Sequence, residues 1–235
     1  MLELLTSIHW GAVLQIVIID ILLGGDNAVV IALACRNLPP AQRTRGILWG
    51  TAGAIILRLV LVSFAVFLLE IPFLKLAGGL LLIWIGVRLI LPSAEAHGNV
   101  KPADRLLAAI KTIIIADFVM SLDNVIAIAG AAQAADESHR IALVAFGLIL
   151  SIPLIIWGST LVLKALDRFP AIVTLGAALL GWIAGGLIIN DPVTDGWPIL
   201  DGAVAQYGAH IVGAALVVIL GYLIKRRRAP VPLES

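Results

Sequence analysis

The chain has 235 residues, of which 61% are hydrophobic and only 13% are charged, and its mean hydropathy is +1.08. Soluble domains are about 45–50% apolar and about 25% charged, so this composition excludes an ordinary soluble protein and indicates an integral membrane protein. The net charge of +1 says little by itself, while the single cysteine, Cys35, excludes an intrachain disulfide and any multi-cysteine metal site.

Seven segments are long and apolar enough to cross a bilayer, which requires roughly 20 mostly apolar residues. We therefore expect an all-α membrane protein in which one transmembrane domain occupies residues 1–235. The expected spans lie at about 9–34, 46–69, 71–91, 107–132, 141–163, 170–189 and 208–224. The segment Met1–Leu5 has no basic residue, so the first span is expected to be a retained helix and not a cleaved signal peptide.

Basic residues near the ends of these spans predict the orientation, because they gather on the cytoplasmic side. With the N-terminus outside, the inner side receives thirteen of them: Arg36, Arg43, Arg45, Arg88, Lys101, Arg105, Lys111, Lys164, Arg168 and the run Lys225–Arg228. The outer side receives only Lys75 and Arg140. We therefore expect an outside N-terminus and a cytoplasmic C-terminus, with 225–235 as a basic cytoplasmic tail.

One polar pattern occurs twice inside the apolar sequence. Asp20, Asp26 and Asn27 in the first span recur 97 residues later as Asp117, Asp123 and Asn124 in the fourth. Ionised groups are costly within a bilayer, so charged residues there indicate a functional site.

The repetition extends beyond this pattern. Arg43 and Gly50 match Arg140 and Gly147 at the same offset, and five residues of the third span match five of the sixth at an offset of 98: Gly78, Leu81, Leu82, Trp84 and Ile85 with Gly176, Leu179, Leu180, Trp182 and Ile183. Spans 1–3 and 4–6 are therefore predicted to be two copies of one three-helix unit, at about 9–91 and 107–189. Three spans per unit place the second copy upside down, and such inverted repeats are typical of secondary transporters with a substrate site at the bilayer midplane.

An antiparallel arrangement of the first and fourth spans would bring four carboxylates and two amides together near the midplane. The expected ligands of a cation there are Asp20, Asp26, Asn27, Asp117, Asp123 and Asn124. Residues six apart on a helix face about 120° away from each other, so both acidic residues of a pair reach one ion only where the helix opens. Gly24-Gly25 is the expected opening in the first copy, and Ser121-Leu122 a weaker one in the second.

Arg58 lies in the middle of the second span and requires a partner. The simpler interpretation is a lasting ion pair with Asp20 or Asp117, and the alternative is that Arg58 releases a carboxylate when a cation arrives. The oxygen ligands suit Mg²⁺, Ca²⁺ or Mn²⁺ and leave the choice among them open. His9, His97, His139 and His210 are expected at or beyond helix ends, away from the ion path.

The sequence resembles the TerC family, the tellurium-resistance-associated membrane proteins of the wider LysE-like exporter superfamily. The resemblance is carried by Gly25-Asp26-Asn27 followed by Ala28–Ala32, by Leu38-Pro39, and by Ser121–Val125 in the second half. It implies efflux of divalent cations, chiefly Mn²⁺, across the bacterial cytoplasmic membrane, with Asp20, Asp26, Asp117 and Asp123 as the ligands. Proton exchange would fit the carboxylates. No cofactor, enzymatic activity or nucleic-acid partner is expected, and the oligomeric state is open.

Two other functions remain open. An intramembrane aspartyl protease would use two membrane aspartates that share a proton, but Leu23 stands where its Gly-x-Gly-Asp pattern requires the first glycine. A factor that assists membrane-protein assembly without transport is the other alternative. The chain has no phosphate-binding loop of the Gly-x-x-x-x-Gly-Lys-Ser/Thr kind, so ATP hydrolysis is not expected.

Overall fold

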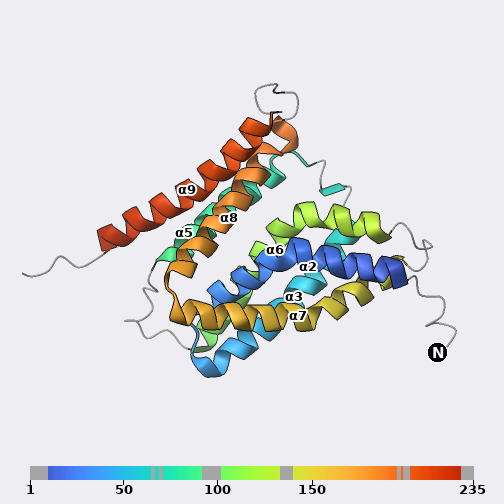
Figure 1. Ribbon diagram of the computed structural model, residues 1–235, viewed down its shortest axis with the longest axis horizontal. Helices are drawn as coiled ribbons and strands as arrows, with labels where there is room; N and C mark the ends of the chain where they lie inside the picture. The colour runs from blue at the N-terminus through green and yellow to red at the C-terminus, as the bar shows by residue number, and fades with distance from the viewer. Residues whose placement is uncertain are drawn as a thin grey trace, which may run out of the picture. The chain divides into compact units, whose positions relative to one another are not determined.

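The computed structural model describes residues 10–64, 67–68, 71–91, 102–132, 140–194, 197 and 202–228. Within these ranges the regular structure is helical, and a long helix stands at each of the seven expected positions (Figure 1). The elements are α2 (Trp10–Cys35), α3 (Pro40–Ser63), α5 (Leu74–Ile90), α6 (Pro102–Ala132), α7 (Arg140–Arg168), α8 (Ala171–Ile189), the short 3₁₀ helix η3 (Pro192–Thr194) and α9 (Ala203–Arg228).

Four of the described helices are long and apolar enough to cross a membrane, namely α3, α7 from Val144, α8 and α9. A fifth span results if the two parts of α2, Val13–Asp20 and Gly25–Cys35, count as one. Helix α5 has 17 residues, fewer than a full span requires, and α6 carries five charged residues. The all-helical membrane character is thus confirmed, while seven spans and the inverted repeat stay predictions.

Two helix ends differ from the expected bounds in ways that matter for the polar residues. Helix α9 begins at Ala203 and continues to Arg228, so the basic run Lys225–Arg228 lies in its last turn and not in a tail. The rest of the expected tail, 229–235, lies outside the described residues. His210, expected at a helix end, therefore lies within α9, where its ring stacks on Trp182 of α8 with the ring centroids 4.7 Å apart.

The described chain divides into two compact units. Unit 1 contains α2, α3, α6 and α7, and unit 2 contains α5, α8 and α9. Unit 1 thus combines the first two helices of each expected repeat, whereas unit 2 combines the third helix of each with the last helix of the chain. The boundary between the sequence repeats is therefore not the boundary between the compact units.

Unit 1 has an apolar core to which all four of its helices contribute. Its largest cluster consists of Val13, Ile16, Ile55, Ile128, Val144 and Leu148, all buried. Helices α3 and α6 approach closely because Gly50 and Gly53 have no side chain: a Cβ added at either would collide with Ile113 or Ile114. This close contact brings the polar residues of α3 and α6 within reach of each other.

Unit 2 is held together by small residues. A Cβ added at Gly181 of α8 would collide with the Gly213 carbonyl of α9, and one added at Gly185 would collide with the Ala209 carbonyl. Gly181 and Gly185, like Ala209 and Gly213, are four residues apart, the spacing at which small residues let membrane helices pack backbone against backbone. Gly79 and Gly86 of α5 and Gly181, Gly185 and Gly186 of α8 all lie where an added Cβ would collide with a neighbouring helix.

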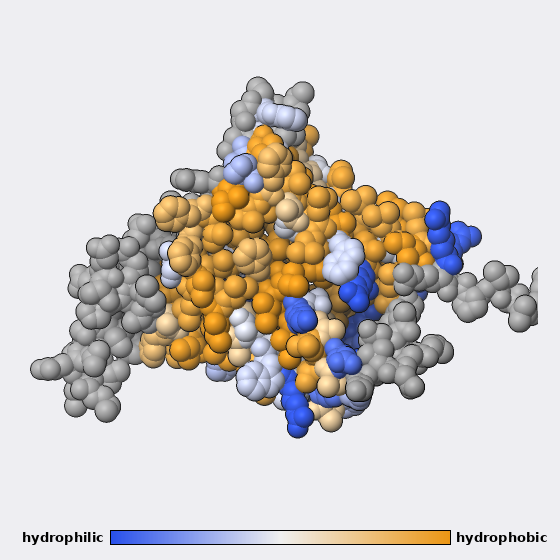
Figure 2. All heavy atoms as spheres, turned by 180° about the vertical axis from the view of Figure 1, so that it is seen from behind, coloured by the Kyte–Doolittle hydropathy of each residue, from blue (hydrophilic) through white to orange (hydrophobic). Residues whose placement is uncertain are grey.

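The outer faces of the helices are apolar. Figure 2 shows hydrophobic side chains over much of the visible face. Large exposed hydrophobic residues occur in both units and include Leu14, Trp49, Ile56, Trp157, Leu175, Val204, Ile211, Val212 and Leu223. Such a surface is unusual for a protein in water and suits contact with lipid.

Candidate functional site

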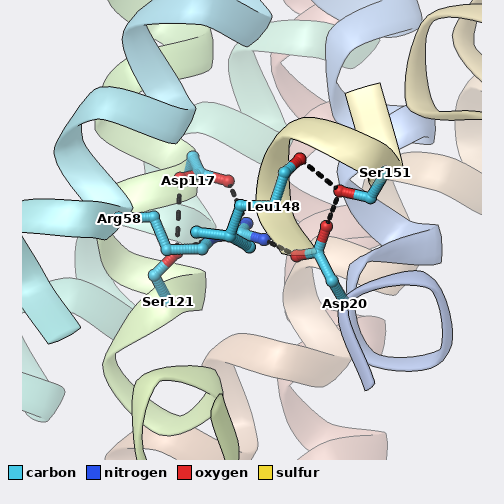
Figure 3. Close-up of polar contacts among 6 residues, drawn as sticks. All are labelled: Asp20, Arg58, Asp117, Ser121, Leu148 and Ser151. Carbon is cyan, nitrogen blue, oxygen red and sulfur yellow. Dashed lines mark hydrogen bonds and ion pairs between the residues drawn. The ribbon is translucent and has the colours of Figure 1, made fainter. Parts of the chain in front are cut away.

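A buried arginine links two helices of unit 1 through two acidic residues. Arg58 of α3, 3% exposed, donates from Nη1 to Asp20 Oδ1 of α2 and from Nη2 to Asp117 Oδ1 of α6, the latter at 2.5 Å. Asp20 and Asp117 are also buried. Figure 3 shows the Arg58 side chain reaching between the two carboxylates. The structure therefore contains the ion pair from which both interpretations of Arg58 start, and this ion pair engages both carboxylates.

Two serines complete the hydrogen bonds of this group. Ser121 Oγ accepts from Arg58 Nε at 3.2 Å and donates to Asp117 Oδ2 at 3.2 Å. Ser151 Oγ of α7 lies within hydrogen-bond distance of Asp20 Oδ2 and of the Leu148 carbonyl (Figure 3). All three guanidinium nitrogens and all four carboxylate oxygens of the group thus have a partner. We call the group of Asp20, Arg58, Asp117, Ser121 and Ser151 the arginine layer.

The arginine layer is costly to bury. With both carboxylates ionised it carries a net charge of −1 within an otherwise apolar helix bundle. Buried ion pairs are often no more stable than apolar residues of the same volume, although removing one partner costs several kcal/mol. Stability alone therefore does not account for this group, which keeps one negative charge that none of its own members balances.

A second group of buried polar atoms lies on α2 and α3. Asn27 is 4% exposed and Thr51 is 2% exposed, and the side-chain nitrogen and oxygen of Asn27 and the hydroxyl of Thr51 have no hydrogen-bond partner within the described part of the chain. The same holds for Asp26 Oδ1. Buried polar atoms are normally paired, since an unpaired one costs about 1–3 kcal/mol, so these atoms call for an explanation.

The remaining expected ligands are in α6. Asn124 is partly buried and interacts with other residues of the protein. The side chain of Asp123 lies outside the described residues. Of the six expected ligands, the structure thus brings Asp20 and Asp117 together through Arg58, and it leaves atoms of Asp26 and Asn27 unpaired. Among the described residues, no three His, Cys, Asp or Glu side chains are placed to hold a metal ion together.

The two expected helix openings differ. Helix α2 is also one continuous helix, over Trp10–Cys35, but it is bent by 48° between Val13–Asp20 and Gly25–Cys35, next to the expected opening at Gly24-Gly25. Helix α6 is one uninterrupted helix over Pro102–Ala132, so the weaker opening expected at Ser121-Leu122 was wrong. Ser121 uses its hydroxyl to bind Arg58 and Asp117 instead.

The sequence did not identify Thr51 or Ser151, nor the contacts of Ser121, as parts of this region. Serine and threonine are common in membrane helices, where they also bond to the carbonyl four residues earlier, as Ser159 does to Ile155. The one available signal for Thr51 is that it lies seven residues before Arg58, which places both on one face of α3.

Comparison with known proteins gives one family and several relatives. The model of the "Integral membrane protein TerC family" matches residues 5–229. The membrane protein YjbE of Bacillus subtilis is 46% identical over 180 residues, which are 77% of this chain and 80% of the relative. YceF of the same organism is 26% identical over 77% of this chain and 72% of its own length, and the inner membrane protein YgdQ of Escherichia coli is 27% identical over 77% and 81%. No solved structure matches the chain at a significant level.

Proposed function

Because the chain belongs to the TerC family of integral membrane proteins, we propose that it is a secondary transporter that exports divalent cations, Mn²⁺ foremost, from the bacterial cytoplasm. The proposed location is the cytoplasmic membrane, with the N-terminus outside and the C-terminus inside. The relative YgdQ is named an inner membrane protein, which supports this location.

The observation that carries the proposal is the position of Arg58 between Asp20 and Asp117. A guanidinium held by two buried carboxylates is itself a cation in a cation site. A divalent ion that approaches the two carboxylates competes with Arg58 for them, because the metal ion and the guanidinium bind the same carboxylate oxygens. Arg58 thus acts as a tethered counter-ion that keeps the site neutralised as far as possible when no metal ion is bound.

The proposed cycle uses this competition. A cation from the cytoplasm reaches Asp26 and Asn27, then replaces Arg58 at Asp20 and Asp117, and leaves on the outer side when Arg58 returns to the carboxylates. Asp123 and Asn124 are the proposed counterparts in the second repeat. Carboxylates that do not pair with Arg58, such as Asp26, carry protons in the opposite direction, which couples export to the proton gradient. The two carboxylates of the arginine layer are separated by the guanidinium, an arrangement unlike a protease dyad, in which two carboxylates share a proton.

The choice of ion follows from the donor atoms. Carboxylate, amide and hydroxyl oxygens suit Mn²⁺, Ca²⁺ and Mg²⁺, and the arginine layer contains no histidine or cysteine that would favour softer metals. The proposal of Mn²⁺ among these three rests on the family resemblance. No cofactor is needed in this scheme, because the metal ion is the cargo.

Transport into proteoliposomes tests the proposal. Purified protein is reconstituted, Mn²⁺, Ca²⁺ and Mg²⁺ are offered in competition, and metal uptake and internal pH are recorded together. We expect Mn²⁺ movement with opposite proton movement, and its loss in Asp26→Asn and Asp123→Asn variants that still insert into the membrane. If the wild-type protein moves none of the three ions, the proposed function is wrong and a role in membrane-protein assembly becomes the better explanation.

A further inference from the structure

The antiparallel pair α2 and α3 carries two polar levels. Near one end of the contact Asp20 meets Arg58, and at the other end a Cβ on Gly46 would touch Cys35 Sγ, so residue numbers rise along α2 as they fall along α3. Asn27 lies seven residues after Asp20, toward the turn that connects the two helices. Thr51 lies seven residues before Arg58, in the same direction along the helix pair. On α3, seven residues make almost two full helical turns, so Thr51 lies on the same face as Arg58, about 10 Å along the helix. On α2 the bend falls between Asp20 and Gly25, so Asn27 is placed at this level by its position between the contacts of Asp20 and Cys35, and not by helical periodicity.

These two levels differ in charge and in hydrogen bonding. At the arginine layer every polar atom of Arg58, Asp20 and Asp117 has a partner. At the level of Asn27 and Thr51 the side chains are neutral, more than nine-tenths buried, and without a partner among the described residues. A folded protein rarely leaves an amide and a hydroxyl unpaired at the same level of one helix pair, unless a ligand supplies the contacts.

Helix α7 leaves this level uncrowded. It runs parallel to α2, since a Cβ on Gly147 would collide with Ile16 and Ser151 binds Asp20. Two turns beyond Ser151, the residue on the same face of α7 is Gly158, where an added Cβ would meet only the Cβ of Ala28, at 3.6 Å. At Gly158, therefore, α7 places no side chain against Ala28, the residue next to Asn27.

We propose that Asn27 and Thr51 form a neutral cation-binding level through which the exported ion passes before it reaches the arginine layer. Asn27 Oδ1 and Thr51 Oγ1 bind the divalent ion directly, and water fills the remaining positions. This proposal rests on the proposed function and extends it, because it gives Thr51 a role as ligand and places an uncharged level on the cytoplasmic side of Arg58. Neutral oxygens bind a divalent ion weakly enough for it to move on.

The test exchanges the ligand atom at residue 51 and measures binding separately from transport. Mn²⁺ binding to the purified full-length protein is titrated by electron paramagnetic resonance, and Cd²⁺ binding by competition. Thr51→Val, which keeps the shape and removes the oxygen, is expected to weaken Mn²⁺ binding about fivefold to tenfold, the factor for one lost polar contact. Thr51→Ser is expected to retain binding within about twofold. Thr51→Cys, which supplies a soft sulfur ligand, is expected to shift preference from Mn²⁺ to Cd²⁺.

Thr160 of α7 is the matched control, because it is a membrane-helix threonine of the same unit whose hydroxyl is bound to the Ile156 carbonyl. Thr160→Val and Thr160→Cys are expected to bind both metals as the wild type does. Wild-type Mn²⁺ affinity in Thr51→Val, together with higher thermal stability from removing an unpaired hydroxyl, would overturn the proposal while leaving the exporter intact. Absence of Mn²⁺ binding and transport in the wild type would overturn both. If Thr51→Val does not fold, Thr51→Cys with its metal preference decides the question.

Discussion

Arg58 Nη2 donates to Asp117 Oδ1 at 2.5 Å across the interface of α3 and α6, although the two residues are 59 positions apart in the chain. The contact depends on Gly50 and Gly53, which let the two helices approach until an added Cβ would strike Ile113 or Ile114. A glycine-lined interface and a buried ion pair thus belong to one structural feature, and each limits the substitutions that the other tolerates.

Removal of the arginine charge leaves two carboxylates facing each other in an apolar bundle. Arg58→Gln is expected to lower the free energy of unfolding by about 3–5 kcal/mol, because the partners of a broken buried ion pair remain charged and unpaired. Added Mn²⁺ is expected to raise the melting temperature of this variant more than that of the wild type, since the metal ion no longer competes with the guanidinium. Thermal unfolding of detergent-purified protein with and without Mn²⁺ measures both effects. A variant as stable as the wild type without metal would contradict this prediction.

The buried aspartate on α2 and an exposed one on α7 give a matched pair of substitutions. Asp20→Asn is expected to abolish Mn²⁺ transport, because it removes a carboxylate that binds Arg58 and the metal ion in turn during the proposed cycle. Asp167→Asn removes an ion pair in which Arg43 Nη1 lies 2.6 Å from Asp167 Oδ2, but the Asp167 side chain is 51% exposed. Such surface pairs contribute about 0–1 kcal/mol, so this control should transport normally. Initial rates in proteoliposomes compare the two, and equal rates would remove Asp20 from the proposed pathway.

The sequence predicted much of the arginine layer because a charged residue inside an apolar span requires a partner of opposite charge. Asp20, Asp117 and Arg58 were identified by their position inside apolar spans, and their pairing followed from the cost of leaving any of them alone. The sequence did not predict that one arginine would bind both carboxylates, since that depends on how far apart α2 and α6 lie. The sequence also could not assign the helices to the two compact units. The repeat is visible in the order of the residues, whereas the units depend on which helix faces pack together.

Asp191 illustrates a residue whose role the sequence did not give. Asp191 stands in an acidic segment with Asp195 and Asp201, a composition typical of a solvated loop, yet Asp191 is fully buried. Its carboxylate accepts 2.9 Å hydrogen bonds from the backbone N–H groups of Phe73 and Leu76 and thereby caps α5 from another part of unit 2. Phe73, at φ 66°, holds the positive-φ conformation that begins this helix. Asp195 and Asp201 lie outside the described residues.

This cap predicts a specific dependence of stability on pH. Burial by itself would raise the pKa of Asp191, but the N–H groups of Val193, Leu76 and Phe73 donate to the carboxylate and hold its pKa below the usual range. The folded state therefore favours the ionised form, so the stabilisation is complete above the unfolded pKa, near 3.9, and is lost as the pH falls through the lower folded value. Asp191→Asn is expected to cost about 1–2 kcal/mol at pH 7. The difference in melting temperature between wild type and variant should shrink below about pH 4, and a difference that is constant down to pH 2 would contradict the assignment.

Two glycines of α9 test the packing of unit 2. Gly213→Ala places a methyl group against the Gly181 carbonyl and is expected to cost about 1–3 kcal/mol through overpacking. Gly208→Ala lies on the same helix, with nothing within 4 Å of the added Cβ, and is expected to gain up to about 1 kcal/mol because alanine favours helices. Melting temperatures of the two variants should therefore move in opposite directions. A shift of the same sign in both would show that α8 and α9 separate more easily than their contacts imply.

The alternation of the two units along the chain has a consequence for biosynthesis. The chain changes unit after Ile71, after Lys101 and after Asp167, so neither unit is complete until most of the protein has been made. Arg58 enters the membrane soon after Asp20 but must wait for Asp117, and Ser151 arrives later still. The arginine layer is thus completed only after α6 and α7 have been made.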